Sequence, residues 1–224
     1  MNLLVTAGPT REYFDSVRFI SNASSGRMGY NIAIEALRRG HNVTLVSGPV
    51  ELPPPPEAHM VNVVSAEEMY HACCRVFSEC HAAIMTAAVC DYRPEVQEQR
   101  KIKKDGKPRS FEMVPTRDIC AHLGSIKGHR RVIGFAMEDH DAREHAREKL
   151  LRKNCDAIIL NHPDNLGLRS GNIEILQADG TWSGPFLGSK SELAGRILNT
   201  LEIEIGVQSG GAGIQESATQ PALP

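Results

Sequence analysis

Two serines and two glycines near the start of the chain have a spacing that could hold an anion. They are Ser24, Ser25, Gly26 and Gly29. A periodic apolar segment follows and predicts a helix over residues 26–39, for which the serines are suitable N-caps. Bare N–H groups and the positive dipole end of a helix favour a bound phosphate, and glycine lets the ligand approach closely. The stretch therefore predicts a phosphate cradle, to which Arg27 adds a positive charge.

Lysines further along the chain could neutralise the charge of a triphosphate. Transfer of a group from a nucleoside triphosphate needs a phosphate cradle, cations near the reacting phosphorus and usually Mg²⁺. The candidate cations are Lys101, Lys103, Lys104, Lys149 and Lys153. Asp91, beyond the apolar segment 82–86, could face a metal ion or a ribose. These residues favour nucleotide-dependent group transfer and contain no motif that identifies the base.

An NAD(P) oxidoreductase fits the residues less well. Its G-x-G-x-x-G turn is missing, because Pro-Thr-Arg-Glu follows Gly8. The acidic residue expected after the second strand is replaced by Ser47 and Gly48, and no tyrosine has a lysine four residues later. A Walker A pattern is also missing from the sequence.

A metal hydrolase is a weaker alternative. Acidic residues and two histidines cluster at residues 138–145, but His140 and His145 are five residues apart. A spacing of four would align two side chains on one helix face. The solvated terminus of a polar helix explains this cluster better.

Alternating strand and helix patterns would bring the polar loops to one edge of a sheet. Strands are predicted at residues 2–7, 42–47, 60–64, 82–86, 131–136 and 157–160, and helices at 26–39, 65–79, 117–123, 141–153 and 189–204. This alternation builds right-handed βαβ units, so we expect an α/β fold with a doubly wound, mostly parallel, Rossmann-like sheet. Ligands of such sheets bind beyond the carboxyl ends of the strands, where the loops after strands one, four and five meet.

Four further segments depart from this alternation. Residues 13–23 predict an unusually long loop, and residues 101–114 predict a β-hairpin arm that turns at Asp105-Gly106. A strand at 172–176 belongs to an edge hairpin with its turn at Asp179-Gly180. The Gly-, Ser- and Pro-rich residues 206–224 predict a disordered tail. We therefore expect one nucleotide-binding synthetase domain over residues 1–205.

The composition excludes several classes of protein. With 41% hydrophobic and 23% charged residues and a net charge of −2, the 224-residue chain offers no basic surface for nucleic acid. No apolar run approaches the ~20 residues that cross a bilayer, and the start lacks signal-peptide features. We expect a cytoplasmic protein with no membrane partner. The six cysteines form no CxxC pair, which favours free thiols and leaves only Cys90 open as a reactive residue.

The early motif is long and specific. Residues 5–12 read VTAGPTRE and residues 15–29 read DSVRFISNASSGRMG. The chain closely resembles phosphopantothenate–cysteine ligase, the synthetase half of the bacterial bifunctional coenzyme A biosynthesis protein. The same resemblance continues through residues 44–50, 87–94, 101–104, 134–136 and 149–154, and it covers about residues 1–205.

The resemblance implies a two-step ligation. The carboxylate of 4′-phosphopantothenate attacks the α-phosphate of CTP, pyrophosphate leaves, and the amine of L-cysteine then attacks the acyl-cytidylate and releases CMP. Mg²⁺ is required. The flavin-dependent decarboxylase half of the bifunctional protein is missing from the sequence. We therefore expect a stand-alone ligase without FMN, working beside a separate decarboxylase.

The resemblance also implies roles for individual residues. Asn22 would hold the carbonyl of the acyl-cytidylate, Arg18 and Ala88 would line the same intermediate, and Lys101 would close over the triphosphate. The implied nucleotide site comprises Ser24, Ser25, Gly26, Gly29, Met85, Thr86, Ala87, Asp91, Arg117, Asp118, Ile119, Cys120, Phe135, Lys149 and Lys153, with Asp91 also the candidate metal ligand. The arm at 101–114 resembles the element through which the family forms homodimers.

The sequence departs from the family pattern at four places. Pro115-Thr116-Arg117 stands where the family has Lys-Asn-Pro, and Met137-Glu138-Asp139 where it has Ala-Glu-Thr. Cys90 replaces a small residue, and His162-Pro163 replaces the usual Asp. Since Asn22 and Lys101 are retained, we expect activity, with CTP preferred to ATP. The alternatives are a nucleotide-binding protein that has lost the reaction and an NAD(P) oxidoreductase.

Overall fold

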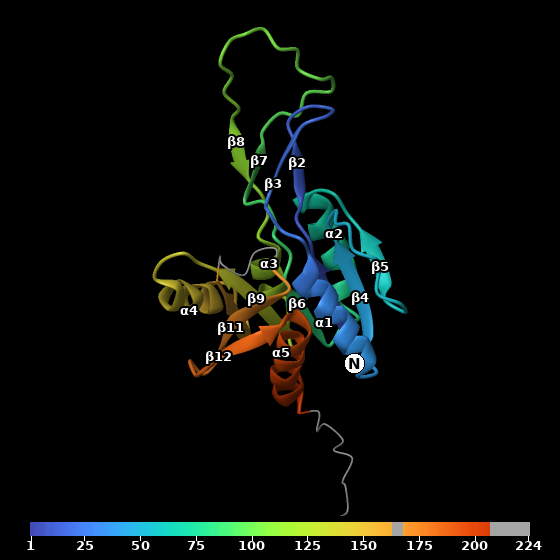
Figure 1. Ribbon diagram of the computed structural model, residues 1–224, viewed down its shortest axis with the longest axis vertical. Coiled ribbons are helices and arrows are strands. Elements are labelled where there is room, and N and C mark those ends of the chain that lie inside the picture. Colours follow the sequence, from blue (N-terminus) through green and yellow to red (C-terminus); the bar gives the residue numbers. More distant parts are fainter. Residues whose placement is uncertain (163–167, 207–224) are drawn as a thin grey trace, which may run out of the picture.

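Six parallel strands form the centre of the structure, a computed structural model that describes residues 1–162 and 168–206. They are β1 (Asn2–Ala7), β4 (Asn42–Ser47), β5 (His59–Asn62), β6 (Ala82–Met85), β9 (Arg131–Met137) and β10 (Ala157–Asn161). An antiparallel hairpin of β11 (Ser170–Gln177) and β12 (Trp182–Ser189) continues the sheet at the β10 edge. The full order is β12-β11-β10-β9-β6-β1-β4-β5 (Figure 1). The prediction of a mostly parallel α/β sheet is confirmed.

Helices cover both faces of this sheet. One face packs against α1 (Arg27–Arg38) and α5 (Lys190–Ile205), and the other against α2 (Ala66–Phe77), α3 (Ile119–Ser125) and α4 (Ala142–Arg152). Side chains of a strand alternate between faces, so Leu3 and Val5 join the first core while Leu4 joins the second. Strands buried on both faces must be almost wholly apolar, which is why their sequence pattern is easy to recognise.

The strand order reverses between β1 and β6. Along the six parallel strands the chain order is 3-2-1-4-5-6, which is that of a Rossmann-like sheet. In sheets of this order the connections from the two middle strands leave in opposite directions, and ligands bind beyond the carboxyl ends of these strands, a region here called the crevice. This crevice is where the fold positions a ligand.

The helix starts use different capping groups. Ser65 accepts a hydrogen bond from the Glu68 N–H (3.2 Å), and Ser189 forms a full capping box with Glu192. The predicted serine cap of α1 is wrong. Its N-cap is Gly26, with φ of 73° and no side-chain cap, while Ser24 Oγ lies 3.4 Å from the Gly26 N–H. A positive φ at this position suits glycine, which has no Cβ to clash.

Two short antiparallel ribbons form an arm that projects beyond the sheet (Figure 1). One pairs β2 (Arg11–Tyr13) with β3 (Phe19–Ser21), and the other pairs β7 (Tyr92–Pro94) with β8 (Met113–Pro115). The prediction that residues 13–23 are a loop is therefore wrong. The predicted hairpin over 101–114 is also wrong, because β8 pairs with β7, which lies outside the predicted range, and residues 95–112 contain no strand. Strands of three residues are too short to show a periodic pattern.

Other boundaries shift by a few residues. The helix predicted from residue 117 begins at Ile119, with Asp118 as N-cap, and the third strand ends at Asn62 rather than Val64. Within the described ranges, no helix has the length and apolar character needed to span a membrane. Most of the predicted tail, and Pro163, lie outside the described residues.

Candidate nucleotide site

Backbone and side-chain hydrogen bonds join the loops after β1 and β6 directly above the crevice. The Ala88 N–H donates to the Gly8 carbonyl (2.9 Å), and the Thr10 N–H donates to the Ala88 carbonyl (3.3 Å). The Thr6 carbonyl accepts a hydrogen bond from the Thr86 hydroxyl, and the Thr6 hydroxyl accepts one from the Ala87 N–H (3.1 Å). The site residues Thr86, Ala87 and Ala88 are therefore held at the end of the neighbouring strand.

Glycines let the start of α1 pack against these loops. A Cβ on Gly29 would lie 2.5 Å from Thr86 Oγ1 and 2.6 Å from Ala7 Cβ. A Cβ on Gly26 would lie 2.8 Å from Val50 Cγ1, and one on Gly48 would lie 1.8 Å from the Pro9 carbonyl oxygen. The helix start, with Ser24 and Ser25 before it, thus lies against the ends of β1 and β6. Its free N–H groups can receive a phosphate there.

Asn22 faces the loop after β6. Its Nδ2 donates to the carbonyls of Ala88 (3.1 Å) and Val89 (2.9 Å). Both amide hydrogens are therefore used within the protein, and Oδ1 is the remaining polar atom of the side chain. The predicted donation from Asn22 to a substrate carbonyl requires one of these two bonds to open. Asn22 and Ala88 therefore lie side by side, and their shared contact with one intermediate stays a prediction.

The segment after β6 is tied to the base of the arm. Thr116 donates through its hydroxyl to the Cys90 carbonyl (2.6 Å) and through its N–H to the Asp91 carbonyl (2.9 Å). Burial raises the pKa of the Cys90 thiol, so this residue is packed rather than reactive. Asp91 has an exposed side chain. In the described part of the chain, no three His, Cys, Asp or Glu side chains are grouped as metal ligands.

Two lysines, one on α4 and one at its C-cap, form ion pairs with residues at the end of β9 and the start of α3. Lys149 and Lys153 are four residues apart and therefore share one helix face. Lys149 forms an ion pair with Glu138, which follows β9, and Lys153 lies 3.1 Å from Asp118. Asp118 also caps α3, accepting from the Ala121 N–H (3.0 Å). A phosphate bound near these lysines would compete with the two carboxylates for them.

Several predicted nucleotide residues are also core residues. Met85 and Ile119 belong to the core on the α2 face, and half-buried Phe135 packs against the core on the α1 face. Arg117 turns toward α2 instead of the crevice. Its guanidinium lies 4.7 Å from the Tyr70 ring centroid and 3.5 Å from the Glu67 carboxylate. The place of Arg117 in the nucleotide site stays a prediction.

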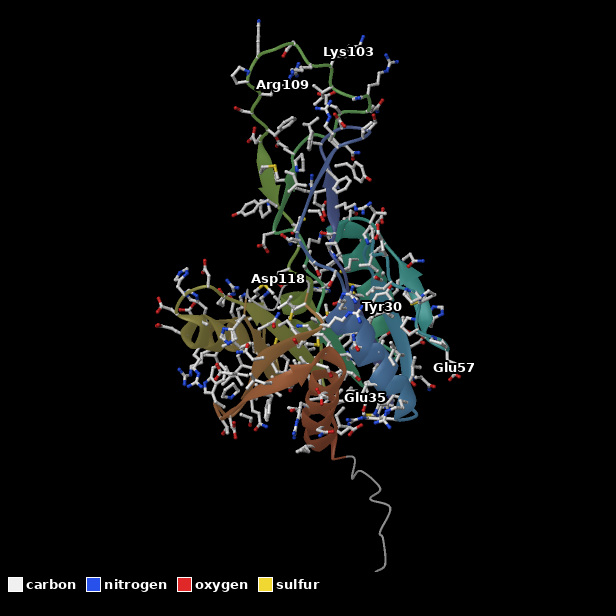
Figure 2. All side chains as sticks on the ribbon, in the orientation of Figure 1. Tyr30, Glu35, Glu57, Lys103, Arg109 and Asp118 are labelled. Carbon is white, nitrogen blue, oxygen red and sulfur yellow. The ribbon has the colours of Figure 1, made fainter. Side chains whose placement is uncertain are left out.

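Arg18 and Lys101 lie on the arm, apart from the other site residues. They line a cavity of about 660 Å³ together with Lys103 and Arg109. Figure 2 places Lys103 and Arg109 at the far end of the arm from Asp118. Within one chain, the predicted catalytic cations Arg18 and Lys101 therefore lie apart from the start of α1, which forms the predicted phosphate cradle.

Buried Asp15 forms hydrogen bonds that connect the turn between β2 and β3 to residues 95–112, the loop between β7 and β8. Its carboxylate accepts from the N–H groups of Val17 (2.8 Å), Arg18 (2.8 Å) and Ile102 (3.2 Å). Burial raises the pKa of Asp15, but these hydrogen bonds and the Arg18 charge lower it overall. Arg18 also donates to the Ile102 carbonyl. Asp15 thus places Arg18 and Lys101 side by side.

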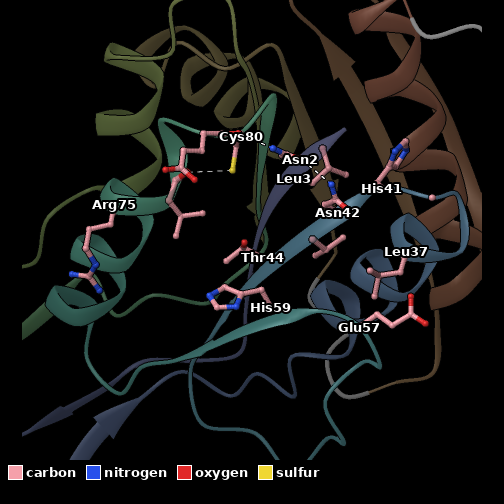
Figure 3. Close-up of a pocket in the computed structure, with 14 residues that line it drawn as sticks. Asn2, Leu3, Leu37, His41, Asn42, Thr44, Glu57, His59, Arg75 and Cys80 are labelled. Carbon is pink, nitrogen blue, oxygen red and sulfur yellow. Dashed lines mark hydrogen bonds between the residues drawn. The ribbon is translucent and has the colours of Figure 1, made fainter.

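A second cavity, of about 580 Å³, lies at the opposite end of the sheet (Figure 3). Asn2, Asn42 and His59 line it, and all three begin strands. Parallel strands place their ligand crevice at the carboxyl end, so this cavity is separate from the candidate site.

The predicted site omits four residues that the structure makes important. Asp15, Thr10 and Glu138 hold or face predicted site residues, and Gly48 allows the loop after β4 to touch Pro9. Gly48 could have been found from its position directly after a strand. The buried state of Asp15 and the partner of Glu138 depend on contacts with residues 87 and 11 positions away, which no local pattern reports.

The chain matches a known family over almost its whole length. The family model described as DNA/pantothenate metabolism flavoprotein C-terminal domain matches residues 1–204. The chain is 43% identical over 206 residues to the coenzyme A biosynthesis bifunctional protein CoaBC of Escherichia coli K12, covering 88% of this chain and 50% of that protein. The chain thus spans about half the length of this curated relative.

Solved structures agree with this match. The C-terminal domain of a CoaBC protein superposes with a TM-score of 0.81 at 37% identity, covering 92% of this chain and 96% of that one. A Cab2 variant in complex with phosphopantothenate-cysteine shares the fold at 14% identity, with a TM-score of 0.75 and coverage of 92% and 87%. The chain therefore belongs to the family of the DNA/pantothenate metabolism flavoprotein C-terminal domain, in agreement with the resemblance to phosphopantothenate–cysteine ligase.

Proposed function

We propose that the protein joins 4′-phosphopantothenate to L-cysteine and consumes CTP. The observation that carries this proposal is the crevice between β1 and β6, where Asn22 meets Ala88 and Val89 beside the start of α1. The crevice offers an anion site and an amide side chain next to each other. An acyl-nucleotide needs both, one for its phosphate and one for its acyl carbonyl.

The nucleotide phosphates bind at the start of α1 and face the lysines of α4. The first turn of α1 offers its N–H groups, and Lys149 of α4 and Lys153 at the C-cap of α4 supply positive charge. Thr86 and Ala87 place backbone groups beside the base. The carboxylate of phosphopantothenate attacks the α-phosphorus, the bond to the β-phosphate oxygen breaks, and pyrophosphate leaves with that electron pair.

Asn22 acts in the second step. The cysteine amine attacks the acyl carbon, and the carbonyl oxygen gains negative charge until the bond to CMP breaks. A donor at this oxygen stabilises the transition state, and Asn22 provides it by releasing one of its bonds to the loop after β6. The positive charges of Arg18 and Lys101 favour departure of pyrophosphate once the arm segment closes over the crevice.

Mg²⁺ fits this site as a companion of the triphosphate. The ion is commonly bound by one or two carboxylates together with substrate phosphates, so the single exposed carboxylate of Asp91 is a sufficient protein ligand. When bound, Mg²⁺ neutralises phosphate charge.

The arm supports a homodimer. It exposes Val17, Phe19, Tyr92, Val96 and Phe111, whose exposed fractions range from 38% to 66%. A cluster of exposed apolar side chains on a projecting element is typical of an interaction surface. We propose that a second copy covers this surface. Arg18 and Lys101 of the arm then reach a crevice at the carboxyl ends of β1 and β6.

One assay tests the function. The protein is incubated with 4′-phosphopantothenate, Mg²⁺ and either CTP or ATP, with and without L-cysteine, and pyrophosphate is measured. We expect pyrophosphate and a trapped acyl-cytidylate without cysteine, and phosphopantothenoylcysteine with it. Nucleotide binding without pyrophosphate would support the alternative of an inactive binding protein, and no turnover with either nucleotide would overturn the ligase proposal.

A further inference from the structure

Two thiols meet at the edge of the candidate site. Cys120 lies in the first turn of α3, Cys155 lies two residues before β10, and their Sγ atoms are 3.5 Å apart. The two residues are 35 positions apart in the sequence. Cys155 is 5% exposed, and its N–H donates to the Leu150 carbonyl (3.0 Å), which fixes its backbone. Cys120 is more accessible than Cys155.

The two sulfurs are already close enough for a short movement to join them. Both lie over Gly134 of β9, where an added Cβ would be 3.1 Å from Cys155 Sγ and 3.5 Å from Cys120 Sγ. A disulfide has an S–S length of about 2.05 Å, so the sulfurs need to approach by only about 1.5 Å. A short helix that carries one of them can make this movement more easily than a buried strand.

The charges around the pair favour a thiolate at Cys120. The hydrogen bond from Cys155 and the positive charges of Lys153 and Lys149 lower the pKa of Cys120, against burial, which raises it. The same contact with Cys120, together with burial, raises the pKa of Cys155. By contrast, burial raises the pKa of Cys73 to about 12 and that of Cys80 to about 11. Since the thiolate is the nucleophile, Cys120 is the thiol that is expected to attack first.

We infer that Cys120 and Cys155 form a reversible disulfide when the protein meets a hydroperoxide. The Cys120 thiolate attacks one peroxide oxygen, the O–O bond breaks, and hydroxide leaves to give a sulfenic acid. The Cys155 sulfur then attacks the Cys120 sulfur and water departs. In total, two thiols and one hydrogen peroxide give one disulfide and two waters. A dithiol reductant reverses the change.

The bridge alters the nucleotide site, an inference that rests on the proposed function. Cys120 follows Asp118 by two residues, and Cys155 follows Lys153 by two residues. Drawing the sulfurs together shifts both members of the Asp118–Lys153 ion pair (3.1 Å). We expect the oxidised protein to bind CTP more weakly than the reduced protein.

The chemical test uses the full chain and does not depend on its activity. The native protein is treated with hydrogen peroxide and analysed by intact mass, thiol titration and non-reducing peptide mapping. We expect the mass to fall by two hydrogen atoms, the thiols to fall from six to four, and one cross-linked peptide pair to contain Cys120 and Cys155. Dithiothreitol should restore all six. A different pairing, or oxidation without a disulfide, would overturn the inference.

Two matched variants complete the test. Cys155→Ala should lose the disulfide, so that Cys120 gains oxygen instead of losing hydrogen. Cys80→Ala removes another buried thiol and should still lose two hydrogen atoms. CTP binding is then titrated calorimetrically on reduced and oxidised wild type. Equal affinity of the reduced and oxidised protein for CTP would overturn the inference that the disulfide alters the nucleotide site. If the reduced protein binds no CTP, the proposed function fails while the peptide map still decides the disulfide.

Discussion

At the scale of single residues, Asn22 joins two parts of the candidate site. Its side chain comes from the segment before α1, and both of its amide hydrogens reach carbonyls after β6. Asparagine can serve both as a brace for this loop and as a donor to a developing oxyanion, because its amide carries two hydrogens. Aspartate has a similar shape but accepts hydrogen bonds only.

We expect Asn22→Asp to form the acyl-cytidylate and to transfer it to cysteine about 100-fold more slowly, the cost of losing one oxyanion donor. Rapid-quench measurement of the two steps separates them. Asn42→Asp is the matched control, since Asn42 lies at the opposite end of the sheet and its Nδ2 donates to Asn2. Loss of the first step alone in the Asn22 variant would contradict the role given to this residue.

At the scale of elements, α1 is held by packing at its start and by ionic contacts at its end. Gly29 brings the first turn against β1 and β6. At the last turn, Glu35 pairs with Arg38 (2.7 Å) and Arg39 (2.9 Å), and Arg39 also reaches Glu202 of α5 (2.8 Å). The helix that forms the cradle is thus fixed at both ends.

Gly29→Ala should destabilise the protein by about 1–3 kcal/mol, because the new methyl group clashes with the strand ends. Thr86 Oγ1 and Ala7 Cβ are the nearest obstacles, at 2.5 and 2.6 Å. Urea unfolding measures the change. Gly195→Ala is the control within α5, where the nearest atom is 3.4 Å from the new Cβ. This variant should be neutral or more stable, because alanine favours helix by about 1 kcal/mol. Equal effects at both positions would refute the packing argument.

The Glu35 cluster makes stability depend on pH. Hydrogen bonds from Arg38 and Arg39 lower the pKa of Glu35 to about 2, although burial opposes this shift. Because the folded-state pKa lies below the unfolded value of 4.5, the stabilisation is present above that value and is lost as pH falls toward 2.

Glu35→Gln should cost about 1–2 kcal/mol at pH 7 and progressively less between pH 5 and 2. Thermal unfolding at several pH values measures this difference between variant and wild type. Glu51→Gln, at an exposed position, should follow the wild-type curve throughout. A constant difference between Glu35→Gln and wild type over this range would contradict the assignment.

At the scale of the whole molecule, the arm and the sheet edge hold different parts of the proposed site. Arg18 and Lys101 lie on the arm with Asp15, whereas Asn22, the start of α1 and the α4 lysines lie at the sheet. A second copy packed against the exposed apolar residues of the arm would cover the surface that one chain leaves open. The assembly is therefore expected to be part of the catalytic unit.

The double variant Val17→Asp/Val96→Asp should convert a dimer into a monomer, because each new carboxylate would lose its contact with water in the proposed interface. Sedimentation velocity measures the mass, and far-ultraviolet circular dichroism checks the fold. Leu187→Asp changes a residue that is 78% exposed on β12 and should leave the dimer intact. A wild-type monomer at micromolar concentration would contradict the proposed assembly.

The regular part of the fold could be predicted from the sequence, for a physical reason. The inner parallel strands are covered on both faces and must be largely apolar, and the helices between them must show an apolar stripe. These patterns lie within a few consecutive residues. The long motif at residues 5–29 likewise pointed to the family, which the comparisons confirm.

Contacts between distant residues were decided only by the tertiary structure. The three-residue strands of the arm carry no readable period, and β8 pairs with β7, which lies outside the predicted hairpin. The buried state of Asp15 depends on Ile102, the turning of Arg117 on Tyr70, and the closeness of Cys120 to Cys155 on the packing of α3 against β9. A sequence records residue types and local order, whereas these properties arise when the folded backbone brings remote residues together.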